Sequence, residues 1–202
     1  MTFHPTFLPT ISPSISSTNI DGNTPAWLLE DDPAPVGMSA KSVIFDIADD
    51  WGRAIALGVR SIEFSLGGSV IPLLSSDFTA YATNSANSDS LPEFSFDTSL
   101  SKVGDTTLVS WNTSFYTSTN QRLIIVFNSE QTFDEIIINN YHRLGYYPDS
   151  GAKNVKITTS TDAITDVTYN AAIANSTVLN NTAWPEHVAL DIADDQTVWA
   201  SA

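Results

Sequence analysis

The chain has 202 residues, of which 23 are acidic and 8 basic, so its formal net charge is -15, and it contains no cysteine. At this length we expect one domain, or one domain with an extension. The absence of thiols excludes disulfide scaffolds and cysteine-ligated zinc or iron–sulfur sites. The scarcity of cations argues against nucleic acid as a partner. Hydrophobic residues make up 42% of the chain and charged residues 15%, which excludes a disordered acidic tail.

The first 40 residues differ in composition from the rest of the chain. Six of the ten prolines fall within the first 35 residues, which contain no Lys or Arg. Because proline fixes φ and favours extended geometry in its neighbour, this pattern predicts an extended arm over residues 1–40 ahead of a domain at 41–202. The arm either docks on a neighbouring subunit or wraps its own domain. Its apolar anchors for docking are Phe3, Phe7, Leu8, Ile11, Ile15, Ile20, Trp27 and Leu28.

From Lys41 onward the hydrophobic pattern is that of short β-strands. Apolar residues alternate with polar ones, as in Ile62, Phe64 and Leu66, and Gly67-Gly68 predicts a hairpin turn. Residues 162–175 are the one helix candidate, although their threonines argue against it. The pattern predicts an all-β sandwich. The expected strands are 42–48, 58–66, 70–74, 78–83, 123–127, 135–141, 154–159 and 187–192.

One pentapeptide occurs twice, as Asp46-Ile-Ala-Asp-Asp50 and as Asp191-Ile-Ala-Asp-Asp195, and a tryptophan follows each copy. The flanking sequences do not align further. Two similar strand-to-turn corners and two duplicated units are therefore both open interpretations.

The segment from Phe64 to Asp162, about half of the chain, resembles the discoidin or coagulation-factor C-type domain, a galactose-binding-like jelly roll. The residues that carry the resemblance are Phe78–Ser85, Trp111, Gln121–Phe127, Phe133–Tyr141 and Gly151–Asp162. Leu57–Leu66 is also similar to a segment common in phage tail and fibre proteins. The resemblance implies a jelly-roll β-sandwich with binding loops at one end. The cysteines that clamp many secreted members of that family are absent.

A polar and aromatic cluster lies between the expected strands 135–141 and 154–159. Sugar binding needs an aromatic face together with planar donors and acceptors, and the cluster offers His142, Arg143, Tyr146, Tyr147 and Asp149. Two other interpretations remain open. Asn140-Tyr141 with Gly151 is typical of a structural corner, and tyrosine and arginine are also common at subunit interfaces.

Trp111 and Trp184, with Tyr116, form a second aromatic set on polar segments. Packing in the core or at its rim and stacking on a ligand are the two alternatives.

Paired aspartates raise the question of a metal site. The resemblance implies calcium as a structural ion, and Asp49, Asp50, Asp194 and Asp195 are the weak candidates, with Asp31-Asp32 as a further pair. No regular Asp-x-Asp-x-Asp loop occurs, so solvated turns are the alternative interpretation. We expect no other cofactor.

No catalytic constellation is evident in the sequence. The histidines at 4, 142 and 187 lack metal-ligand spacing, and no Gly-x-Ser-x-Gly elbow occurs. We therefore expect a protein that is not an enzyme, and a glycan hydrolase with two carboxylates is the remote alternative.

The surface polarity, the lack of cysteine and the lack of a signal-like or membrane-spanning segment favour a phage virion protein made in the host cytoplasm. Two roles remain open for such a protein. It is either a tail, fibre or decoration component that binds host glycans, or a purely architectural cementing protein. Other virion subunits and further copies of this chain are the expected partners, without nucleic acid or membrane insertion.

Overall fold

The computed structural model describes residues 37–52, 55–100, 110–114, 116, 119–141, 148–165, 168, 179–180, 188–189 and 196–200. The chain divides into two units, Met1–Ala34 and Pro35–Ala202, and all described residues belong to the second. The predicted arm anchors lie outside the described residues. The first strand begins at Met38, slightly before the predicted domain start at Lys41.

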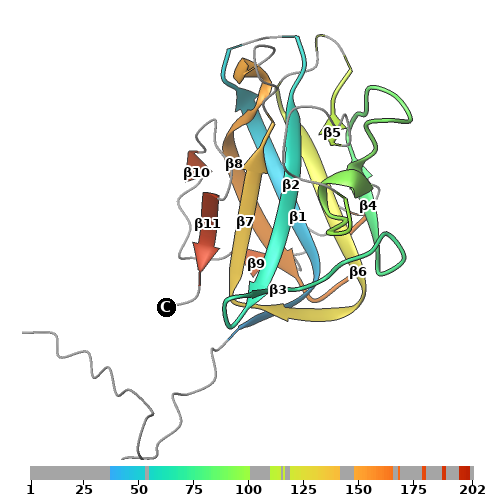
Figure 1. Ribbon diagram of the computed structural model, residues 1–202, viewed down its shortest axis with the longest axis vertical. Coiled ribbons are helices and arrows are strands. Elements are labelled where there is room, and N and C mark those ends of the chain that lie inside the picture. Colours follow the sequence, from blue (N-terminus) through green and yellow to red (C-terminus); the bar gives the residue numbers. More distant parts are fainter. Residues whose placement is uncertain are drawn as a thin grey trace, which may run out of the picture. The chain divides into compact units, whose positions relative to one another are not determined.

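The described residues form an all-β structure of two antiparallel sheets (Figure 1). The larger sheet has the order β10, β8, β1, β6, β4, with β9 beside β8. Its strands are β1 (Met38–Asp50), β4 (Phe78–Ala82), β6 (Gln121–Phe133), β8 (Ala152–Ser160), β9 (Leu179–Asn180) and β10 (Val188–Ala189).

The smaller sheet has the order β11, β7, β2, β3, with β5 beside β2. Its strands are β2 (Gly58–Leu66), β3 (Ser69–Val70), β5 (Trp111–Asn112), β7 (Glu135–Asn140) and β11 (Gln196–Ala200). Helical structure in the described residues is limited to the short 3-10 helices η2 (Pro92–Ser95) and η3 (Pro148–Ser150). No helix among these residues has the length and apolar character that crossing a membrane requires.

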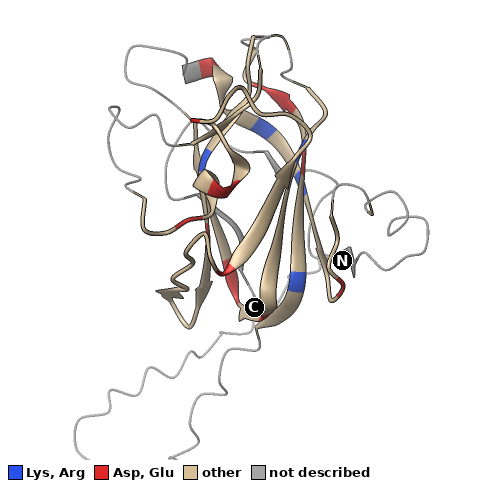
Figure 2. Ribbon diagram, turned by 90° about the vertical axis from the view of Figure 1, so that its right-hand side faces the viewer, with Lys and Arg blue, Asp and Glu red and all other residues tan. Residues whose placement is uncertain are grey.

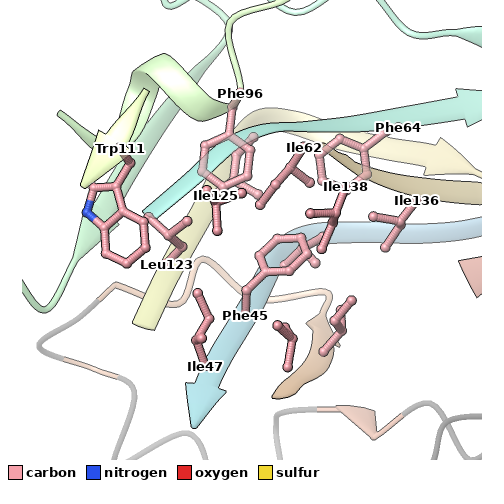
Figure 3. Packing of buried hydrophobic residues seen from close by; sticks show 14 of the residues in the cluster. Phe45, Ile47, Ile62, Phe64, Phe96, Trp111, Leu123, Ile125, Ile136 and Ile138 are labelled. Carbon is pink, nitrogen blue, oxygen red and sulfur yellow. The ribbon is translucent and has the colours of Figure 1, made fainter. Parts of the chain in front are cut away.

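The inward-facing side chains of the two sheets meet in one hydrophobic core (Figure 3). Alternation in β1 places Phe45 and Ile47 in this core, and β2 contributes Phe64, whose ring packs edge-on against Phe127 at 5.3 Å between centroids. Burying one such side chain stabilises the fold by about 2 kcal/mol. The predicted sandwich character of these strands is confirmed.

The outer face of the larger sheet is partly covered by the chain that follows β8. Ile164 packs on Ile44 of β1 and Ile124 of β6. The Ser42 hydroxyl fixes this segment, since it donates to the Asp162 carbonyl at 2.7 Å and accepts from the Ile164 amide at 2.8 Å. The cover explains why β6 is apolar on both faces.

One local prediction is wrong, and one helix candidate is described only in part. The predicted strand 70–74 is strand only at Val70, because Pro72 has no amide hydrogen to donate and the Leu73 amide donates to the Thr98 hydroxyl. Of the helix candidate 162–175, against which its threonines already argued, residues 162–165 and 168 are described, and they form no helix. Thr165 and Thr168 bond each other's side chains and backbone instead, which competes with helical hydrogen bonding.

The predicted hairpin turn is confirmed, because Gly67 and Gly68 have φ values of 59° and 72°, as a tight two-residue turn requires. The first copy of the repeated pentapeptide, Asp46–Asp50, ends β1. The second copy, at 191–195, lies outside the described residues.

Candidate functional site

Connections from both sheets gather at one end of the sandwich, which we call the loop end. The register shows why: Ile47 and Asp50 at the end of β1 pair with Gln121 and Ala152 at the starts of β6 and β8. The loop end comprises the described residues of the connections 51–57, 83–91, 113–120 and 141–151, and it lies at the top of Figure 1. The opposite end, which we call the turn end, carries the Gly67–Gly68 turn, the 71–77 connection and Asp134.

A buried corner anchors both roots of the β7–β8 connection. The Asn140 side chain is fully buried, donates to the Ala152 carbonyl at 2.7 Å and accepts from the Tyr141 amide at 2.9 Å. A β-carbon on Gly151 would lie 2.7 Å from Asn140 Oδ1, so this position has no room for a side chain. The predicted structural corner is therefore confirmed, and it fixes the strands from which the 142–147 segment leaves.

A second glycine completes the corner. Gly58 bridges Gly151, and a β-carbon on Gly58 would lie 2.9 Å from the Tyr141 ring and 3.0 Å from the Trp111 carbonyl oxygen. The starts of β2, β5 and β8 approach closely here because both residues at the bridge are glycines.

The structure describes only part of the predicted sugar-binding set. Asp149 lies in η3 and is partly exposed at the loop end. His142, Arg143, Tyr146, Tyr147 and Trp184 lie outside the described residues.

Trp111 is a core residue rather than a ligand-contacting one. Its side chain is fully buried, and the ring Nε1 donates to the Asn84 carbonyl at 2.8 Å. Figure 3 shows the ring at one edge of the hydrophobic cluster. Of the two roles that the sequence left open for this tryptophan, packing is the one observed, and stacking on a surface ligand is excluded by its burial.

The aspartates at the end of β1 serve as hydrogen-bond acceptors for the chain itself. Asp49 accepts from the Asn154 side-chain amide at 2.7 Å, and Asp50 accepts from the Gly52 amide at 2.9 Å. Within the described part of the chain, no three His, Asp or Glu side chains are grouped to hold a metal ion. Asp194 and Asp195 lie outside the described residues, so the calcium hypothesis is untested there.

The described residues of the β5–β6 connection form hydrogen bonds with two other segments of the chain. Thr113 and Leu57 exchange two bonds, from the Thr113 amide to the Leu57 carbonyl at 2.8 Å and from the Leu57 amide to the Thr113 hydroxyl at 2.9 Å. On the other side, the Ser114 amide donates to Asn84 Oδ1 at 2.6 Å and its hydroxyl to the Ser85 carbonyl at 3.2 Å. These bonds hold the connection between its neighbours.

Tyr116, in the same connection, is 85% exposed and has a left-handed backbone with φ of 66°. Its amide donates to the Ile55 carbonyl. Trp51 is a second exposed aromatic at the loop end, and Lys153 Nζ lies 5.1 Å from the centroid of its ring. Trp51 was not among the predicted binding residues, whereas Tyr116 belonged to the second aromatic set, for which the sequence left core packing and stacking on a ligand open. The sequence shows that Tyr116 is aromatic and lies in a polar segment, but it does not show exposure.

Basic residues are sparse on the described strands and loops (Figure 2). Arg122 pairs with Asp46 across β6 and β1 at 2.8 Å, and Lys153 lies over Trp51. The hydrogen bonds that hold the β5–β6 and β7–β8 connections come from amides, hydroxyls and carbonyls. The arrangement offers neutral polar groups and exposed aromatic faces to a partner.

Comparison of the chain with protein-family models, with curated proteins and with solved structures gives no match.

Proposed function

We propose that this protein is a non-enzymatic structural component of a phage virion, in the tail, fibre or decoration layer, and that its sandwich binds host-surface glycans through the loop end. The observation that carries the proposal is the construction of that end. Loops from both sheets converge on a buried corner at Asn140 and Gly151, and exposed aromatic residues accompany neutral polar groups there. Binding residues commonly lie on loops that a rigid scaffold positions.

We also propose that the sandwich is a discoidin-like jelly roll. The order of the strands along the chain supports this, since β4, β5, β6, β7 and β8 alternate between the larger and the smaller sheet. Such alternation places successive connections at the two ends of a sandwich. The end of β7 and the start of β8 lie at the same end as Tyr116.

A virion role fits weak binding at each site. A single sugar-binding loop gives modest affinity, and many copies on one particle multiply it through effective concentration. Other subunits of the particle, including further copies of this chain, are the partners that this proposal requires.

Host polysaccharide binding and particle adsorption test the proposal directly. The full-length, assembled protein is titrated against polysaccharides purified from the host surface, and particles carrying Tyr146→Ala with Tyr147→Ala are compared with wild type. We expect the double variant to weaken binding at least about tenfold, because aromatic contacts dominate small interfaces. Adsorption should fall in parallel.

The matched control is the double truncation Val70→Ala with Leu74→Ala, which removes two exposed apolar side chains from the turn end. It should leave binding and adsorption unchanged. If wild-type protein binds no host polysaccharide and the tyrosine variant adsorbs normally, the glycan-binding role is wrong and the purely architectural role takes its place.

A further inference from the structure

Tyr116 is the most exposed large hydrophobic residue in the described part of the chain, at 85%, whereas the next, Leu74, is 50% exposed. It also has a backbone conformation that residues with a β-carbon disfavour, since its φ is 66°. A bulky exposed residue in this conformation contributes no core packing that would offset the strain. Selection for folding alone would favour glycine or asparagine at this position.

The strain is maintained by bonds on both sides of Tyr116. Its own amide donates to the Ile55 carbonyl, and four residues further on the Asn120 amide donates to the Ala48 carbonyl at 3.0 Å. On the N-terminal side, Ser114 is bonded to Asn84 and Ser85. These bonds hold Ser114, Tyr116 and Asn120 before any ligand arrives, which reduces the ordering that binding requires at these residues.

The groups around this position are uncharged and polar. Asn84, Ser85 and Ser114 supply amides, hydroxyls and carbonyls, which match the alternating donors and acceptors of sugar hydroxyls. A tyrosine ring offers an apolar face and a polar end to the same ligand.

The charges described at the loop end are mostly negative. Asp49, Asp50 and Asp149 lie there, and Lys153 is engaged with the ring of Trp51. Together with the formal net charge of -15, they disfavour anionic ligands.

We infer that Tyr116 is a sugar-stacking residue and that the saccharide it takes is uncharged. This inference rests on the proposed glycan-binding function and extends it, because it adds the β5–β6 connection to the binding surface and names the ligand class.

The decisive variant is Tyr116→Gly, which removes the ring and relieves the left-handed strain at once. If the ring serves binding, affinity falls at least about tenfold, while the thermal midpoint stays at the wild-type value or rises by about 2–4 °C. Tyr116→Phe keeps the stacking face and should retain affinity within about threefold, because one exposed hydroxyl contributes little. Asn120→Gly is the matched control, since it relaxes the other left-handed residue of the loop, at φ of 52°, and removes no ring.

The probes are dextran, mannan and galactan as neutral polysaccharides, and polygalacturonate and polysialic acid as anionic ones, titrated against the full-length assembled protein. Binding to a neutral probe that Tyr116→Gly weakens and Asn120→Gly leaves unchanged supports the inference. Unchanged affinity of Tyr116→Gly, or a preference of wild-type protein for the anionic probes, overturns it.

The outcomes separate the inference from the function on which it rests. If the Tyr146→Ala, Tyr147→Ala variant loses binding and Tyr116→Gly keeps it, the proposed function stands and the role of Tyr116 is wrong. Wild-type protein that binds neither these probes nor host polysaccharide overturns both.

Discussion

The β5–β6 and β7–β8 connections at the loop end are held by neutral groups, whereas at the turn end carboxylates join neutral groups as hydrogen-bond acceptors. At the loop end the bonds come from Asn140, Asn84 and Thr113. At the turn end Asp134 accepts from the Gly67 amide at 2.7 Å, and Asp77 accepts from the Leu74 amide at 2.9 Å. Carboxylates lose acceptor capacity when they are protonated, but amides and hydroxyls do not titrate.

Protein amides and hydroxyls therefore carry the hydrogen bonds of these two connections, and carboxylates carry part of those at the turn end. Two glycines at opposite ends also differ in packing, because Gly58 is enclosed by neighbouring atoms, whereas Gly68 at the turn end has nothing within 4 Å of an added β-carbon. Substitutions at matched positions in the two ends measure these differences.

The largest expected effect is that of Gly58→Ala. The added methyl group would meet the Asn112 side chain, the Tyr141 ring and the Trp111 backbone, none of which can move without disturbing the corner. We expect the free energy of unfolding to fall by about 3 kcal/mol, as for overpacking in a rigid core. Urea denaturation followed by tryptophan fluorescence measures the change.

Gly68→Ala is the control at the turn end. The site is open and the cost arises from its φ of 72° alone, so we expect a loss of about 1 kcal/mol. Equal losses for the two variants would mean that the corner is not the more tightly packed region.

Asp97 gives the second prediction. It follows η2 and accepts from the Ser75 amide at 3.0 Å, and from the Ser99 amide at 2.9 Å and hydroxyl at 2.5 Å. Burial raises the pKa of this carboxyl, but the hydrogen bonds from Ser99 and Ser75 lower it more, so its pKa lies below the ordinary aspartate value. Asp97→Asn should lower the free energy of unfolding at pH 7 by about 2 kcal/mol, because one oxygen acceptor is replaced by a donor.

The pH dependence of this difference follows from the lowered pKa. The stabilisation by Asp97 is fully present above the pKa of an aspartate in the unfolded chain, about 3.9, and is lost as the pH falls through the lower folded-state value. The difference in the free energy of unfolding between wild type and Asp97→Asn should therefore decrease when urea denaturation is repeated at pH 3. A gap that stays constant between pH 7 and pH 3 would contradict this mechanism. Asp77→Asn, at an exposed carboxylate of the 71–77 connection, should give a smaller loss of the free energy of unfolding.

The main strands could be predicted from the sequence because the alternation of apolar and polar residues along a strand indicates which face is buried. Phe45 and Ile47 in β1 and Phe64 in β2 lie inside, as their alternation indicates. The strands β3, β5 and β9 have only two residues each, which is too short for an alternating pattern. Whether they form depends on where the partner strand passes. The corner was predictable in outline, because Asn140 and Gly151 are residue types that favour it.

The candidate site could be predicted only in part. Residue type alone could not decide whether Trp111 packs in the core or contacts a ligand. In its buried position the ring Nε1 donates to the carbonyl of Asn84, which is distant in sequence. The exposure of Tyr116 depends likewise on bonds to Ile55 and on Ser114 bonds to Asn84. Such contacts join segments about 30 to 60 residues apart, and no local pattern encodes them.

The smallest expected effect is that of Leu74→Ser, at the turn end. Leu74 is 50% exposed, and the backbone amide that bonds Asp77 is unchanged by the substitution. We expect the free energy of unfolding to change by less than about 0.5 kcal/mol, as at most surface sites. Polysaccharide binding should be unchanged, because the proposed binding surface is the loop end. Urea denaturation and the same titration measure both quantities, and reduced binding with unchanged stability would mean that the turn end also contacts the ligand.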